Sequence, residues 1–131
     1  MSMEFIAARS GAKRASCASE MVQGDGWGLI SGVLPIDLGN DRTPLPEQIE
    51  AQTRQVLGNL ETILVARGLT KDNVVAVRVA LVDLPRLEER MESAYAGFFA
   101  ADRLPSRSVI GVAYLPRGAL VAMDFTLRVT A

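Results

Sequence analysis

The sequence predicts an α+β domain in which a mixed β-sheet carries two helices on one face. Two stretches show the 3.6-residue periodicity of helices, and several shorter stretches alternate or run apolar as strands do. Along the chain these stretches follow the order strand, strand, helix, strand, helix, strand, strand. With 131 residues, the chain is predicted to form a single domain spanning residues 1–131.

The first 35 residues are predicted to form strands. Asp25 and Gly26 separate the apolar pair 21–22 from residues 27–31, which is typical of a tight hairpin, because glycine accepts the positive φ that such a turn requires. Residues 35–46 are rich in proline, aspartate, asparagine and glycine, so a loop is expected there.

The clearest helix is predicted from Glu47 to Arg67, with Gly68 as its C-terminal stop. The following strand, Val74–Val82, is apolar on both faces apart from Arg78, so both of its faces should be covered. Two helices can cover one face of the sheet but hardly both. A second copy of the chain is the simplest cover for the other face, and a homo-oligomer is therefore expected.

The C-terminal third is predicted to contain a second helix, Arg86–Ala100, and two further strands. These strands, Arg107–Tyr114 and Ala119–Val129, are joined through a short turn. The last strand alternates regularly, which indicates one apolar face and one more polar face.

Composition restricts the chemistry available. The net charge of −1 and the pI of about 5.4 do not favour nucleic acid as a partner. The chain has no histidine and one cysteine, Cys17, which excludes a Cys/His metal site and any Ser-His or Cys-His nucleophile pair. No metal is expected. The single thiol suits a reducing cytoplasm, no apolar run approaches the roughly 20 residues that span a bilayer, and no signal peptide is recognised, so a cytoplasmic location is expected.

Several segments resemble, in order, the motifs of the RidA family, also called YjgF. The similarity covers nearly the whole chain. The matching segments are Ser31-Gly32-Val33-Leu34-Pro35, Gln52-Thr53-Arg54-Gln55 with Asn59-Leu60, Val82-Asp83-Leu84, Tyr95 with Phe98-Phe99, Pro105-Ser106-Arg107-Ser108, and Leu115-Pro116 with Gly118-Ala119-Leu120-Val121.

The resemblance implies a chorismate-mutase-like (YjgF-like) fold assembled as a homotrimer, with ligand sites in clefts between subunits. It also implies hydrolysis of small carboxylate-bearing enamines and imines, such as 2-aminoacrylate and 2-iminopropanoate, to 2-keto acids and ammonia, without any cofactor. Some members of the family carry the older label endoribonuclease. RNA cleavage is not favoured here, because the chain lacks histidine and a basic patch.

Three substrate-binding residues follow from the resemblance. Arg107 falls on the family arginine that clamps the substrate carboxylate, which suits the planar, permanently charged guanidinium. Ser31 falls on the serine of the Ser-Gly segment, and Val109 stands where the family often has cysteine. Taken from the sequence alone, Arg107 could instead form a structural ion pair.

The family glutamate that positions or activates the attacking water is replaced by Ala122. Two acids are candidates for the catalytic role. Asp124 lies two residues further along the same strand face, and Glu92 stands where the family has asparagine.

Two functions therefore stay open. The first is an imine or enamine deaminase in which positioning by Arg107, with or without a replacement acid, suffices for an intrinsically easy hydrolysis. The second is a non-catalytic trimer that has kept the clamp and binds 2-keto acids or related metabolites.

Overall fold

The computed structural model describes residues 2–7 and 17–129, and it confirms an α+β fold with two helices on a mixed sheet. The six strands pair in the order β1-β2-β3-β6-β4-β5, with β4 and β5 parallel and every other pair antiparallel. The elements are β1 (Glu4–Ile6), β2 (Met21–Gly24), β3 (Trp27–Val33), α1 (Ile49–Ala66), β4 (Val74–Val82), α2 (Leu84–Tyr95), β5 (Ser106–Val112) and β6 (Val121–Arg128).

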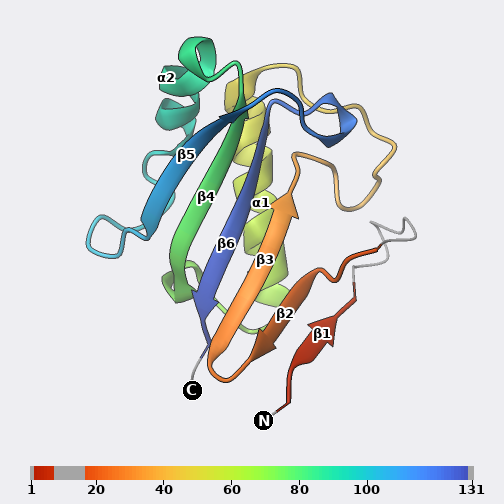
Figure 1. The fold of residues 1–131 in the computed structure, drawn as a ribbon, viewed down its shortest axis with the longest axis vertical. Helices are drawn as coiled ribbons and strands as arrows, with labels where there is room; N and C mark the ends of the chain where they lie inside the picture. The colour runs from red at the N-terminus through yellow and green to blue at the C-terminus, as the bar shows by residue number, and fades with distance from the viewer. Residues whose placement is uncertain (1, 8–16, 130–131) are drawn as a thin grey trace.

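Both helices lie behind the sheet in Figure 1, which views the molecule from the uncovered face. The side of β6 that points to the helices carries only apolar residues, all of them buried: Val121, Met123, Phe125 and Leu127. Apolar residues of α1, among them Val56 and Leu60, pack in the same core cluster. The predicted helical periodicity therefore marks the core side of α1.

The hairpin between β2 and β3 has the geometry that its sequence predicts. Asp25 and Gly26 have φ values of 59° and 83°, as a two-residue turn between twisted strands requires. The second helix is shorter than predicted. It ends at Tyr95 rather than Ala100, because Gly97 turns the chain with a φ of 85°.

Strand β4 departs from strict alternation at its start. The pairing with β6 shifts by one residue between Val74 and Ala76, which buries Val74 and leaves Val75 38% exposed. Strict alternation along this apolar stretch predicts that Val75 shares a face with the buried Val77, and the bulge makes that prediction wrong.

The uncovered face of the sheet is partly closed by the chain itself. Leu34, just before the predicted loop, and Leu45, near its end, pack with Leu115, Ala119 and Ala122 in a second apolar cluster over one end of β4 and β6. The rest of this face is open, and the large exposed apolar side chains on it include Phe5, Trp27, Leu29 and Ile110. The face that the sequence was expected to leave for a second copy of the chain is therefore smaller than the whole sheet.

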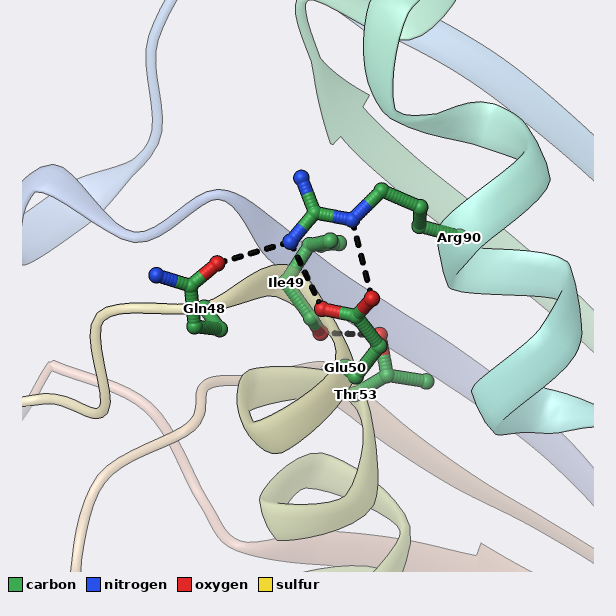
Figure 2. A network of polar contacts seen from close by, with 5 residues as sticks. All are labelled: Gln48, Ile49, Glu50, Thr53 and Arg90. Atoms are coloured by element: carbon green, nitrogen blue, oxygen red, sulfur yellow. Dashed lines mark hydrogen bonds and ion pairs between the residues drawn. The ribbon is translucent and has the colours of Figure 1, made fainter.

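Helices α1 and α2 are joined by a polar network around Arg90 (Figure 2). The Arg90 guanidinium donates from Nε and Nη2 to the two oxygens of Glu50, at 2.8 and 2.9 Å, and from Nη2 to Oε1 of Gln48 at 2.7 Å. This two-pronged pairing fixes the position of α2 against the start of α1. The placement of α2 matters because that helix supplies part of the candidate site.

Candidate functional site

Arg107 lies on β5, the edge strand of the sheet beside α2 (Figure 1). It pairs in register with the buried Val77, so its side chain points to the helix side of the sheet. There its guanidinium donates from Nη2 to Oε2 of Glu92 at 2.5 Å and stacks over the ring of Tyr95, 4.6 Å from the centroid. Glu92 and Tyr95 are one helical turn apart on α2 and therefore reach the same point.

The ion pair sets the electrostatics of this group. The hydrogen bond from Arg107 to Glu92 is the main reason that the pKa of the guanidinium is raised, while partial burial acts in the opposite direction. Burial raises the pKa of Tyr95 to about 12; Arg107 opposes that shift and Glu92 adds to it. The Tyr95 hydroxyl is buried and makes no hydrogen bond within the part of the chain that the structure describes. Arg107 and Glu92 are 24% and 36% exposed, so a small ligand has access to both.

A hollow of about 360 Å³ lies on the opposite, uncovered face of the sheet. Ser31 from β3, Arg78 from β4, Ser108 from β5 and Asp124 from β6 all line it. The register places Arg78 between Ser108 and Asp124 across the neighbouring strands. Arg107 borders the hollow where β5 forms its edge, although its guanidinium points away to α2.

Asp124 has a backbone partner. Its Oδ1 accepts a hydrogen bond from the N–H of Gly32 at 2.7 Å, at the bulge where the pairing of β3 with β6 shifts between Ile30 and Val33. Gly32 takes a φ of 65°, which an L side chain adopts only with strain. Asp124 therefore holds the bulge that presents the exposed Ser31.

Val109 and Ala122 both lie in apolar surroundings. Val109 is two residues beyond Arg107 on the same face of β5 and packs against the main core. Ala122, where the resemblance leads one to expect a glutamate, is only 7% exposed and belongs to the apolar cluster under Leu34 and Leu45.

The predicted site residues thus fall into two groups. Arg107, Glu92 and Val109 lie on the helix side of β5, and Ser31 and Asp124 lie on the uncovered face. Two further residues were not among the sequence candidates. The sequence feature that could have indicated Tyr95 is its spacing of one helical turn from Glu92. The feature that could have indicated Arg78 is its position as a lone charge in an apolar strand.

No group of three or more acidic or cysteine side chains within residues 2–7 and 17–129 is arranged to hold a metal ion. Among those residues, no helix is both long enough and apolar enough to cross a membrane.

The fold, with an ion-paired arginine on an edge strand, defines a class of small α+β proteins. The sequence comparisons identify the family within that class. The family model described as Endoribonuclease L-PSP matches residues 14–129. A RutC family protein of Pyrococcus horikoshii is 31% identical over 106 residues, covering 81% of this chain and 82% of its own length. Another, from Sulfurisphaera tokodaii, is 35% identical over 92 residues, covering 70% and 71%. The chain belongs to the Endoribonuclease L-PSP family, which is the RidA/YjgF family.

Solved structures agree with this assignment. A conserved Rid family protein, YyfA of Yersinia pestis, is described as of unknown function and superposes with a TM-score of 0.86 at 30% identity, over 98% of this chain and all of its own. A putative endoribonuclease of Thermotoga maritima gives a TM-score of 0.85 at 28% identity, over 98% and 99% of the two chains. The YjgF gene product of E. coli, at 24% identity and a TM-score of 0.83 over 95% and 98%, shows the same fold.

Proposed function

We propose that the protein hydrolyses small carboxylate-bearing imines and enamines, of the 2-iminopropanoate and 2-aminoacrylate type, to 2-keto acids and ammonia. The observation that carries the proposal is the partly exposed Arg107 guanidinium with the carboxylate of Glu92 hydrogen-bonded to one of its nitrogens. Glu92 takes one N–H group of the fork, and the remaining N–H groups are available to a ligand carboxylate.

We propose different roles for the two candidate acids. Glu92 adjoins the group that holds the substrate, so it is the acid placed to accept a proton from an attacking water. Asp124 is engaged with the Gly32 N–H, so it positions Ser31 instead of reacting. Val109 supplies an apolar wall beside Arg107.

The division of the site residues between two faces supports a site shared by subunits. The Arg107 guanidinium and the Ser31 hydroxyl lie on opposite faces of one chain, so one small ligand touches both only when a second copy supplies one of them. Strand β5 is at the edge of its sheet, where a neighbouring subunit can approach Arg107. We therefore expect a homotrimer with intersubunit sites.

This hydrolysis needs few catalytic groups from the protein. Water adds to the C=N carbon, a proton moves to nitrogen, ammonia leaves as the C=O bond forms, and no metal or organic cofactor takes part. Fixing the carboxylate at Arg107 orients the reacting carbon, and positioning alone removes much of the barrier of such a reaction.

The test is semicarbazide trapping of the imine that an amino-acid oxidase releases from alanine. The parent should speed imine loss, Arg107→Lys should slow it, and Asp124→Asn should keep most of the activity, because an asparagine oxygen still accepts from Gly32. Glu92→Gln should lose about 10²-fold, the lower range for a positioned general base. A parent that leaves the rate of imine loss unchanged contradicts the proposal.

The second candidate is a trimer that binds 2-keto acids or related metabolites without catalysis. The observation that favours it is the apolar surrounding of Ala122, where no carboxylate replaces the family glutamate. Ala122→Glu distinguishes the two. If the parent is inactive and the folded Ala122→Glu variant is active, the result supports the non-catalytic binding function.

A further inference from the structure

We infer that Glu92 makes the Arg107 site selective for ligands that carry a cationic nitrogen next to the carboxylate, so that it prefers the protonated imine over the 2-keto acid product. This inference rests on the proposed function and specifies the charge state of its substrate. It assigns Glu92 a role in ligand choice beyond its place beside the reacting group.

The charges around the guanidinium carry the first step. Glu92 lies 2.5 Å from Nη2 of Arg107 and cancels most of its positive field at short range. Glu88, one turn earlier on α2, adds a further negative contribution at Arg107. A ligand with one negative charge therefore approaches an Arg107–Glu92 pair that is nearly neutral overall. The acidic residues of α2 behind this pair do not favour its binding.

The hydrogen-bonding pattern carries the second step. Glu92 uses Oε2 for Arg107, and its Oε1 accepts no hydrogen bond from any residue that the structure describes. The guanidinium retains N–H donors beside this bond, so the pair presents donors next to an acceptor. A carboxylate and a protonated nitrogen on neighbouring carbons present the complementary pattern of acceptor and donor. A 2-keto acid has the carboxylate but only an acceptor oxygen in place of the nitrogen.

The ring of Tyr95 limits how a ligand can approach. Its centroid lies 4.6 Å from the guanidinium carbon of Arg107 and occupies that side of the group, so the ligand carboxylate is expected to bind in the plane of the fork, as bidentate pairs do. In-plane binding brings the neighbouring atom of the ligand towards the carboxylate of Glu92. The atom at that position is the imine nitrogen in the substrate and the carbonyl oxygen in the product.

The reaction changes the charge that Glu92 meets. Water and the iminium acid, neutral overall, give the keto acid anion and ammonium, so the group next to Glu92 loses its proton donor and its positive charge. The oxygen that replaces it is repelled by the carboxylate, which favours departure of the product. Glu92 thus sets both the substrate preference and the release of the product.

The experiment is calorimetry on the whole protein with two ligands that share a carbon skeleton, alanine (each enantiomer) and pyruvate. The parent should bind one alanine enantiomer about tenfold more tightly than pyruvate, the scale of one charge pairing near a protein surface. In Glu92→Gln the order should reverse, with pyruvate tighter and alanine weaker than in the parent. Glu89→Gln removes a charge from an exposed position on the same helix that makes no ion pair within the described residues, and it should leave both affinities unchanged.

Circular dichroism and sedimentation are the controls that each variant keeps its fold and assembly. If Glu92→Gln does not fold, Glu92→Asn takes its place in the comparison. An unchanged ligand preference in the folded variants, or a parent that binds neither ligand, overturns the inference. Imine trapping on the same proteins separates it from the proposed function. A parent that hydrolyses the imine without the charge preference refutes the inference alone, and a parent with the preference but no hydrolysis refutes the deaminase alone.

Discussion

At the scale of single residues, the polar side chains of α1 that belong to the family motif hold loops in place. Gln52 and Asn59 are 3% and 4% exposed, yet each has partners. Gln52 donates to the carbonyl of Pro46 and accepts from the N–H of Leu120, at 2.7 and 2.8 Å. Asn59 donates to the carbonyls of Leu34 and Ile36. These bonds anchor both ends of the segment that covers Ala122, so this part of the motif supports the site from a distance.

Replacing Asn59 with leucine tests that role. The variant leaves two enclosed carbonyls without a donor, at about 1–3 kcal/mol each, so the free energy of unfolding should fall by about 2–6 kcal/mol. Urea denaturation measures it. Gln55→Ala removes only the bond to Oδ1 of Asn59 and should cost less than about 1 kcal/mol. Equal costs for the two variants contradict the anchoring role of Asn59.

The clamp itself is tested at Arg107. Arg107→Lys keeps the charge but loses the planar fork, so alanine and pyruvate should both bind about 1.5–3 kcal/mol more weakly, the scale of a hydrogen bond to a charged group. Calorimetry checks this with the same two ligands, because both carry the carboxylate. A variant that binds both as tightly as the parent makes Arg107 a structural residue that fastens α2 to β5.

At the scale of elements, the Glu50–Arg90 pair gives the packing of α1 on α2 a pH dependence. Its hydrogen bonds from Arg90 lower the pKa of Glu50 from 4.5 to about 2. A carboxyl group with a lowered folded-state pKa stabilises the fold fully above its unfolded value, and the contribution disappears as pH falls through the folded value. The parent should therefore lose stability between about pH 4.5 and 2 more steeply than Glu50→Gln. Urea denaturation across that range checks it, and Glu89→Gln, without such a pair, should follow the parent.

The elements were also the part of the fold that the sequence predicted well, and the reason is physical. Periodicity identified α1 and Asp25-Gly26 identified the hairpin, because both signals are local. The bulges in β3 and β4 depend on one extra residue relative to a neighbouring strand, which no single strand reveals. The Arg107–Glu92 pair joins a strand to a helix 15 residues away, and it exists because α2 packs beside β5. Sequence named both residues as candidates but gave no sign that they meet.

At the scale of the whole molecule, the uncovered part of the sheet is the feature that calls for a partner. Leu29, 53% exposed, lies on that face near Phe5 and Trp27, whereas the helices screen the opposite face. Exposed apolar side chains gathered on one face are typical of an interface, and closed cyclic symmetry is the usual outcome for identical chains. The intersubunit site proposed above would need the same arrangement, because its residues are divided between the two faces.

Sedimentation equilibrium should accordingly give about three times the 14.1 kDa chain mass. Leu29→Glu places a charge in the expected interface, where no partner for it is prepared, and should shift the protein towards monomer. Val65→Glu adds the same charge on the outer side of α1, at a position 71% exposed, and should leave the assembly intact. If Leu29→Glu dissociates the trimer and also abolishes imine hydrolysis while Arg107 and Glu92 are unaltered, the site depends on the neighbouring subunit. A parent that is a stable monomer at micromolar concentration removes both the trimer and the shared site.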